Sequence, residues 1–249
     1  NATAQQKDDV QSALERAEKT QDPNERDAHF ADAAFEALED NDYEQALSIA
    51  GRIVDVELRR RAKSWINYQA AEAAREKKQW DDARRYALEV SDTDQRAFLL
   101  FGVAQALLKA NDRPRAIEML QTAQREAEAA EDTPAKVRAL IGIANTWAGF
   151  DALRGFEAIE IAVKAANQLK EPRTFDQDDA RVVRSFESKF GSRTNTSTVP
   201  DFELGRSLVI LARHDFERAL NVAQTLTHKP AKVAALLTLN ESVLKKSEK

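Results

Sequence analysis

The sequence contains no cysteine, and only seven glycines and six prolines occur among its 249 residues. Without cysteine, the chain forms no disulfide and offers no thiolate to a metal ion or to a covalent reaction. The scarcity of helix-breaking residues, beside abundant Ala, Glu, Arg and Leu, favours long helices over sheets. The chain also lacks any run of about 18 apolar residues, so we expect a soluble protein with no membrane insertion.

An excess of positive charge is absent as well. The formal net charge is −5, and charged residues make up 32% of the chain. Binding to nucleic acid without regard to sequence requires a basic field that displaces counterions. Basic runs such as Arg59-Arg60-Arg61 are flanked by acidic residues, which is typical of solvated helix faces. We therefore expect no nucleic-acid partner.

The sequence lacks the motifs that usually carry catalysis or cofactor binding. Its three histidines are far apart in the chain and form no metal-binding motif: His29, His214 and His228. No glycine-rich phosphate loop and no nucleophile-elbow motif is present. We therefore predict that the chain is not an enzyme, that it uses no cofactor and that it holds no metal ion.

The chain does contain an internal repeat. One phrase recurs four times, as Asp42-Tyr43-Glu44-Gln45-Ala46-Leu47, Gln79-Trp80-Asp81-Asp82-Ala83, Asp112-Arg113-Pro114-Arg115-Ala116-Ile117 and Asp215-Phe216-Glu217-Arg218-Ala219-Leu220. Its alanine recurs after 37 residues from Ala46 to Ala83 and after 33 residues from Ala83 to Ala116. Twelve residues before these lie Ala34, Ala71 and Ala104. Small residues at such positions let two antiparallel helices approach closely.

A second phrase indicates where the other helices begin. An acidic residue precedes a basic one by four positions in Asp22…Arg26, Asp55…Arg59, Asp92…Arg96 and Asp132…Lys136. Asp, or a neighbouring Thr, caps the first N–H groups of a helix, where negative charge also suits the helix dipole. With the apolar period, these signals predict helices at 4–19, 23–40, 43–54, 56–77, 80–90, 93–110, 113–131, 134–149, 155–169, 201–213, 215–226 and 229–246.

Residues 170–200 break this pattern. The stretch from Phe190 to Pro200 is rich in Ser, Thr, Asn and Gly and has no helical period. Val182, Phe186 and Phe190 lie on one face of either a helix or a strand. One interpretation is an irregular, tolerated loop, and the other is a short extended segment that packs on the helices or pairs with another chain.

These residues resemble the tetratricopeptide repeat (TPR) over about residues 23–169 and again over about 201–246. Four apolar positions of the family's first helix correspond to Phe30, Ala33, Ala34 and Ala37; Asn67, Ala70, Ala71 and Ala74; Leu100, Val103, Ala104 and Leu107; and Leu140, Ile143, Ala144 and Trp147. The sequence departs from the family in having Ala where its first helix usually has Gly, and in lacking the terminal Pro. The resemblance implies an all-α, right-handed TPR-like solenoid of antiparallel helix pairs, with one irregular insertion near 170–200. We expect a single domain over 1–249, with regular repeats in 1–169 and C-terminal repeats with a cap in 201–249.

The family's geometry also implies which side chains line a concave groove. These peptide-binding candidates are Trp65, Tyr68, Glu72 and Arg75, then Phe98, Phe101, Gln105 and Lys109, and then Arg138 and Asn145. Aromatic side chains beside Arg and Lys suit a peptide partner, although packing between repeats is the alternative role of each aromatic. Only Asn145 matches the family's carboxylate-binding set, so we do not infer recognition of a C-terminal carboxylate.

Two functions follow as hypotheses. The first is a non-enzymatic scaffold that binds a protein or peptide on the concave face, which is how the resembled family mainly acts. The alternative is a structural or assembly protein that forms a homo-oligomer through its repeat ends or through residues 170–200. The chain begins at Asn1 rather than Met. This start, with the absence of Cys, is compatible with a secreted or periplasmic product as well as with a cytoplasmic one. The location of the protein is therefore unknown from the sequence.

Overall fold

The computed structural model describes residues 2–171 and 173–247, so Asn1, the first residue of the sequence, lies outside the described residues. By its internal contacts the chain divides into two compact units. Unit 1 comprises the chain up to Ser91 together with Val183–Asn195, and unit 2 comprises Asp92–Val182 and Thr196–Lys249. Both units are mostly helical. The described residues contain twelve α-helices, one short 3-10 helix and one two-stranded sheet.

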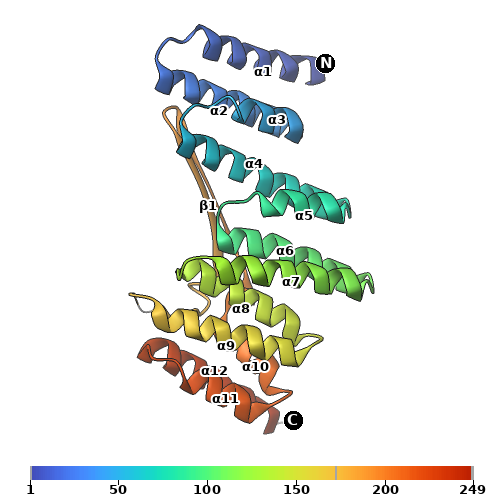
Figure 1. Ribbon diagram of the computed structural model, residues 1–249, viewed down its shortest axis with the longest axis vertical. Helices are drawn as coiled ribbons and strands as arrows, with labels where there is room; N and C mark the ends of the chain where they lie inside the picture. Colours follow the sequence, from blue (N-terminus) through green and yellow to red (C-terminus); the bar gives the residue numbers. More distant parts are fainter. Residues whose placement is uncertain (1, 172, 248–249) are drawn as a thin grey trace. The chain divides into compact units, whose positions relative to one another are not determined.

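Unit 1 contains five consecutive helices and most of the sheet. The helices are α1 (Ala2–Lys19), α2 (Pro23–Glu39), α3 (Tyr43–Ala50), α4 (Val56–Glu76) and α5 (Trp80–Leu88). Each packs against the next in the chain, and α2 also packs against α4 (Figure 1). The first helices of two neighbouring helix pairs thus lie side by side, as a helical repeat requires.

Unit 2 repeats this arrangement with seven helices. They are α6 (Thr93–Lys109), α7 (Arg113–Ala129), α8 (Pro134–Ala148), α9 (Ala152–Gln168), α10 (Leu204–Ala212), α11 (Phe216–Gln224) and α12 (Lys229–Ser247). Helices α6 and α7 pair, as do α8 and α9, and α8 packs against both α6 and α10. A 3-10 helix, η1 (Pro200–Phe202), packs against α8.

The turns between α2 and α3, between α4 and α5 and between α6 and α7 have the same backbone geometry. Asn41, Lys78 and Asn111 have positive φ values of 61°, 59° and 60°. The following residue then donates its N–H to the carbonyl five residues earlier, at 3.0 Å for Asp42, 2.8 Å for Gln79 and 2.9 Å for Asp112. This left-handed residue ends one helix and turns the chain back along it. The first three copies of the recurring phrase therefore each follow the same turn.

The aligned alanines are buried among the packed helices. Ala34, Ala71, Ala104 and Ala144 are buried, and so are the alanines of the second helices, Ala46, Ala83, Ala116 and Ala219. A methyl group keeps the helix axes close while excluding water, and a larger side chain at such a position would force the helices apart.

The helices begin where the second phrase predicts, but the residue that caps the helix differs among them. The carboxylates of Asp22 and Asp55 accept hydrogen bonds from the N–H groups of Glu25 and Leu58, at 2.9 and 2.6 Å. In α8 the cap is the neighbouring Thr133, while Asp132 forms an ion pair with Lys136 at 3.0 Å. Asp92 makes no such bond to the backbone.

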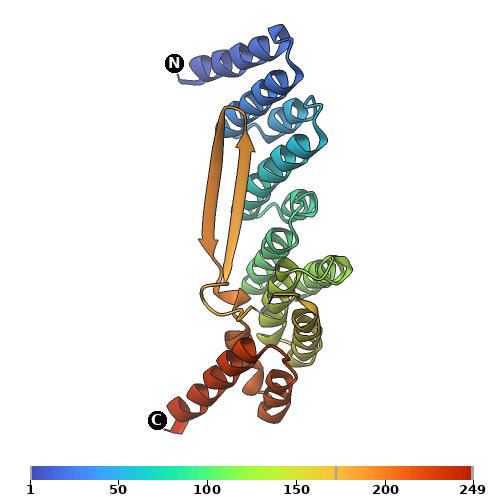
Figure 2. The same ribbon diagram turned by 90° about the vertical axis from the view of Figure 1, so that its left-hand side faces the viewer.

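Residues 181–198 form a regular element, so the expectation of an irregular segment is wrong there. Strands β1 (Arg181–Ser188) and β2 (Gly191–Thr198) form an antiparallel hairpin joined by Lys189 and Phe190 (Figure 2). In β1, Val182, Arg184 and Phe186 are buried and the residues between them are exposed, whereas every residue of β2 is exposed. The extended interpretation is therefore the correct one, because alternate β1 side chains cover apolar surface.

The predicted architecture is confirmed in its coarse form. All twelve predicted helices are present, with differences mainly at their ends, and they pack as neighbouring pairs in the manner of a helical repeat. The largest differences are α3, which ends at Ala50, α9, which already begins at Ala152, and η1, which occupies the predicted start of α10. The handedness of the repeat and the single-domain organisation stay predictions.

We predict that Lys78→Gly stabilises the chain, because lysine at φ 59° carries a steric cost that glycine avoids. The left-handed penalty exceeds glycine's loss of chain entropy, so the free energy of unfolding should rise by about 0.5–1 kcal/mol. The matched control is Lys77→Gly at φ −78°, which should lower stability by about 0.5 kcal/mol. Urea denaturation measures both, and a shift in the same direction for both variants would contradict this account of the turn.

Candidate functional site

The predicted groove residues divide between the two units. Trp65, Tyr68 and Arg75 belong to unit 1, whereas Phe98, Phe101, Gln105, Lys109, Arg138 and Asn145 belong to unit 2. Each set is considered within its own unit.

In unit 1, the face of α4 that carries the predicted residues is covered by the hairpin. Trp65, Tyr68, Glu72 and Arg75 follow one another at intervals of three and four, so they share one side of the helix. Both aromatic rings are buried, and Glu72 and Arg75 are partly exposed. The residue that covers the rings is Arg184 of β1, whose Cζ lies 4.0 Å from the Tyr68 ring centroid and 4.8 Å from that of Trp65.

Arg184 is unusually enclosed for a charged side chain, with 8% of its surface exposed. Stacking on two aromatic rings compensates part of the desolvation of a guanidinium group. Two buried polar atoms in this cluster, Nη1 of Arg184 and Nε1 of Trp65, have no hydrogen-bond partner. The cluster therefore encloses a guanidinium group whose hydrogen-bonding capacity is incompletely used.

The ionisable groups of this cluster shift each other's proton affinity. Burial raises the pKa of the Glu72 carboxyl, and the nearby Arg184 and Arg75 guanidinium groups lower it again in part. Burial likewise lowers the pKa of Arg184, while Tyr68 and Glu72 act in the opposite direction. Glu72 thus supplies the negative charge that favours a cation over the two rings.

Two residues further along β1, Phe186 packs edge-on against Phe35 of α2, with ring centroids 4.6 Å apart. Phe35 in turn lies edge-on to Trp65 at 6.3 Å. Phe186 is only 3% exposed. The arginine and the aromatic residue of β1 therefore occupy two adjacent positions on a continuous aromatic surface made by α2 and α4.

The turn and second strand of the hairpin are held by opposite charges on α2. Lys189 pairs with Glu25 at 2.6 Å, and Arg193 pairs with Glu39 at 3.1 Å while its Cζ lies 4.8 Å from the Phe35 ring. Exposed pairs such as these contribute little individually. They nevertheless connect the turn and the second strand to α2, because each joins a basic residue of the hairpin to an acidic residue of that helix.

In unit 2, the predicted aromatic residue Phe101 is covered by Phe202 of η1, with ring centroids 5.9 Å apart. Gly142 of α8 permits this contact, because a Cβ there would lie 2.6 Å from Phe101 Cε1 and 2.9 Å from Phe202 Cε1. Phe98, which is partly exposed, meets Phe101 edge-on at 5.7 Å. These rings therefore contribute to the packing of unit 2, and Phe101 is not available to a ligand.

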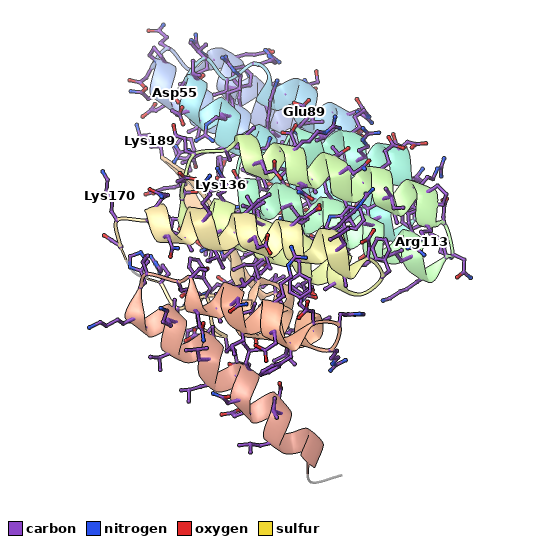
Figure 3. The ribbon with its side chains drawn as sticks, turned by 60° about the horizontal axis from the view of Figure 1, so that its bottom comes forward. Asp55, Glu89, Arg113, Lys136, Lys170 and Lys189 are labelled. Carbon is purple, nitrogen blue, oxygen red and sulfur yellow. The ribbon has the colours of Figure 1, made fainter. Side chains whose placement is uncertain are left out.

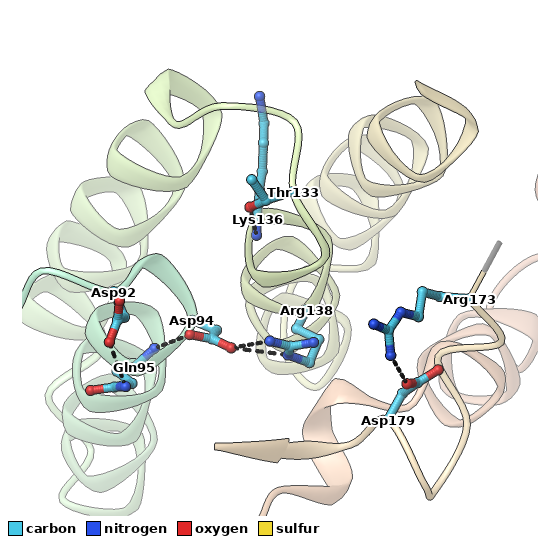
Figure 4. Close-up of polar contacts among 8 residues, drawn as sticks. All are labelled: Asp92, Asp94, Gln95, Thr133, Lys136, Arg138, Arg173 and Asp179. Carbon is cyan, nitrogen blue, oxygen red and sulfur yellow. Dashed lines mark hydrogen bonds and ion pairs between the residues drawn. The ribbon is translucent and has the colours of Figure 1, made fainter. Parts of the chain in front are cut away.

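Arg138, another predicted groove residue, is bound by a carboxylate of the same unit. Its Nε lies 3.0 Å from Oδ2 of Asp94, and Nη2 contacts the same oxygen (Figure 4). Asp94 also accepts a hydrogen bond from the N–H of Gln95, whose side-chain amide donates to Asp92 at 2.7 Å. The ion pair links α6 to α8 and satisfies a buried acid, which is a structural role.

The remaining three candidates, Gln105, Lys109 and Asn145, line one groove of about 710 Å³ in unit 2. The other lining residues are Leu108, Asn111, Arg113, Thr146, Gly149, Phe150 and Ile210. Gln105 donates to Thr146 Oγ1 and Asn145 donates to Ser207 Oγ, each at 3.2 Å. Arg113, labelled in Figure 3, donates to the Phe150 carbonyl at 3.2 Å, with its Cζ 5.2 Å from the Phe150 ring. The groove thus combines oriented amides, an aromatic ring, aliphatic side chains and two cations.

Several residues that define these surfaces were not predicted from the sequence. Arg184 and Phe202 were not selected, and Phe186 was considered only as part of an ambiguous segment. The alternation of Val182, Arg184 and Phe186 is a strand signal, but an arginine at a strand's inner position is ordinarily assigned to the exposed face. Its stacking partners lie more than a hundred residues earlier in the chain, where no local pattern connects them.

Two classes of site are absent from the described part of the chain. No group of three or more His, Cys, Asp and Glu side chains is arranged there to hold a metal ion. No helix among the same residues has the length and apolar character needed to cross a membrane.

We predict that Phe186→Ala loosens the hairpin from α2, because it removes a buried ring in contact with Phe35. Truncating a buried phenylalanine costs about 3 kcal/mol, and amide exchange in residues 183–195 should increase. The control is Val183→Ala. Val183 is 49% exposed and lies on the other face of the same strand, so its truncation should change stability by less than about 1 kcal/mol. Equal melting temperatures and exchange rates for both variants would show that Phe186 does not anchor the hairpin.

In comparisons with protein-family models, with curated proteins and with solved structures, nothing matches this chain.

Proposed function

We propose that the chain is a non-enzymatic scaffold that binds a protein or peptide on the inner face of its helix pairs, arranged as a single right-handed TPR-like solenoid. The observation that supports this proposal most directly is the position of β1. An extended segment of the chain already lies on the face of α2 and α4 that carries Trp65 and Tyr68. A surface that takes an extended segment of its own chain has the shape and chemistry to take one from a partner.

The groove in unit 2 is the place where we expect the partner to bind. It contains Gln105, Lys109 and Asn145, three of the residues that the repeat pattern selects. Recognition sites typically combine an apolar anchor region with a few oriented polar groups. Phe150 and Ile210 provide the former, and the side-chain amides with Lys109 and Arg113 provide the latter. A peptide with an acidic residue beside an apolar one fits this lining.

The groove offers little to a catalytic mechanism, which favours binding over turnover. Among the described residues that line it, the charged groups are Lys109 and Arg113, and neither a carboxylate nor a histidine is present. General acid–base catalysis needs a group that gains and loses a proton near the working pH. We therefore include the absence of enzymatic activity in the proposal.

Site-specific cross-linking tests the groove. Benzoylphenylalanine at Lys109 should capture a defined partner from the native source, because this side chain is exposed at the groove. The control position is Glu128 on α7, which is exposed but outside the groove. Lys109→Glu should weaken capture of that partner by about tenfold, as reversal of an interface charge does. Equal capture from positions 109 and 128 would contradict binding in this groove.

A second candidate function, self-association, is supported by the surface of α12. Val233, Leu237 and Leu244 are each more than half exposed and lie at intervals of four and seven on one face of the helix. Exposed apolar faces of this kind commonly pack against another protein surface. In this alternative, the end of the repeat series joins two copies of the chain.

We predict that, if this alternative holds, sedimentation velocity at micromolar concentration detects a dimer of the intact chain. Leu237→Glu should then shift the population to monomer, because a carboxylate cannot be buried unpaired at an apolar interface. The matched control is Gln121→Glu, the same negative charge on an exposed position of α7. A monomer in all three samples would exclude self-association through α12.

A further inference from the structure

The hairpin presents its side chains to unit 1 in a defined order. Burial alternates along β1, so Arg184 and Phe186 point inward while Val183 and Ser185 point away. Arg184 stacks on Trp65 and Tyr68, and Phe186 packs on Phe35. The surface of α2 and α4 therefore accepts an arginine and an aromatic residue two positions apart in an extended chain.

The surface selects arginine by its shape as well as by its charge. The guanidinium group is planar, and its Cζ is 4.0 Å from one ring centroid and 4.8 Å from the other. A planar cation gains from stacking on aromatic rings in a way that the compact ammonium group of lysine does not. Glu72, four positions from Tyr68 on α4, adds negative charge on the same helix face.

The charges of the surrounding surface fit a basic ligand. Glu25, Asp32, Glu36 and Glu39 of α2 are acidic, and Glu25 and Glu39 bind Lys189 and Arg193 of the hairpin. Burial raises the pKa of Asp32 and of Glu36, and Arg193 lowers both. Basic residues placed along this face therefore stabilise the ionised form of carboxylates that are partly buried close to one another.

The hairpin leaves this surface incompletely satisfied. On the receptor side, Nε1 of Trp65 is a buried hydrogen-bond donor with no partner. This donor weakens the binding of the hairpin relative to that of a ligand that brings an acceptor to the same position. A competing segment with such an acceptor can therefore bind the surface with higher affinity than the hairpin does.

We propose that the Phe35–Trp65–Tyr68–Glu72 surface is a receptor for an extended, basic peptide segment of a partner protein that carries Arg-x-Phe, and that residues 184–186 occupy it as an internal copy of that ligand. This inference rests on the proposed peptide-binding function and assigns a ligand chemistry to unit 1, apart from the groove in unit 2. The hairpin then lowers the apparent affinity of the partner, because the receptor is free only in the fraction of molecules whose hairpin has detached.

The test uses the full chain with Arg184→Ala and Phe186→Ala, which removes the internal ligand without altering the receptor. The probe is a fluorescent peptide with the sequence of residues 181–188, Arg-Val-Val-Arg-Ser-Phe-Glu-Ser. Binding is followed by fluorescence anisotropy, and circular dichroism establishes that the variant is folded. The same titration is run on the unaltered chain.

We expect saturable binding to the variant and weaker binding to the unaltered chain. Replacing the peptide's second arginine by alanine should weaken binding by about tenfold, and replacing it by lysine should weaken binding by about threefold. Glu72→Gln in the variant should also weaken binding, and Tyr68→Phe, which keeps the ring, should not. Equal affinity for the arginine, lysine and alanine peptides would overturn the arginine site.

The outcomes separate this inference from the general proposal. If the peptide does not bind the folded variant, the receptor in unit 1 is excluded, whereas partner capture from position 109 in unit 2 is unaffected. If the unaltered chain is a dimer that the peptide dissociates, the ligand comes from a second copy of the chain. This outcome would overturn the proposal that the ligand belongs to a separate partner protein.

A second variant covers the case in which the first does not fold. Lys189→Glu with Arg193→Glu repels the hairpin from Glu25 and Glu39 while leaving α4 unchanged. Amide exchange shows whether the hairpin has detached. Peptide binding should then exceed that of the unaltered chain, and detachment without any gain in binding would overturn the proposal.

Discussion

The close approach of helices at alanine contacts is the constraint on which the rest of this structure depends. Ala34, Ala71, Ala104 and Ala144, with their counterparts on the second helices, are buried among the packed helices. Because a methyl group buries little surface, the pairing of two helices alone removes too little apolar area from water to stabilise the pair. Larger apolar groups beside the alanines must therefore be covered by something else. Neighbouring helix pairs cover one side, and non-helical segments of the chain cover Phe35, Trp65, Tyr68 and Phe101 on another.

These covering segments connect the packing of the protein to its proposed function. The hairpin in unit 1 and the 3-10 helix in unit 2 place Phe186 and Phe202 on aromatic residues of first helices. In both units, the face expected to bind a peptide thus carries part of the chain itself. What distinguishes the hairpin is its polarity, because it contributes a buried arginine and two ion-paired basic residues to an acidic face. Apolar packing explains why the face is covered, and this charge pattern suggests what else can cover it.

The candidate site was only partly predictable from the sequence. Helical spacing placed Trp65 and Tyr68 on one face, and the resemblance to the TPR family selected Gln105, Lys109 and Asn145, which line one groove. The same spacing could not distinguish an exposed position from a covered one. Arg138 was selected as a groove residue, yet it forms a partly buried ion pair with Asp94, 44 positions earlier in the chain. The covering residues were harder still to identify, because nothing in the sequence near Arg184 indicates that its side chain stacks on two aromatic rings.

The sequence by itself determined the helices and the turns, since these depend on groups a few residues apart. Capping carboxylates, the alanine period and the Asn or Lys at each left-handed turn act within about one helical turn of where they occur. Tertiary structure alone decided that residues 181–198 form a hairpin whose residues 184–193 pack on α2 and α4, and that Phe202 covers Phe101. An isolated two-stranded hairpin is at best marginally stable in water, so its formation depends on distant apolar and charged surface. That dependence is a property of the folded chain, because the surface exists only after the helix pairs have assembled.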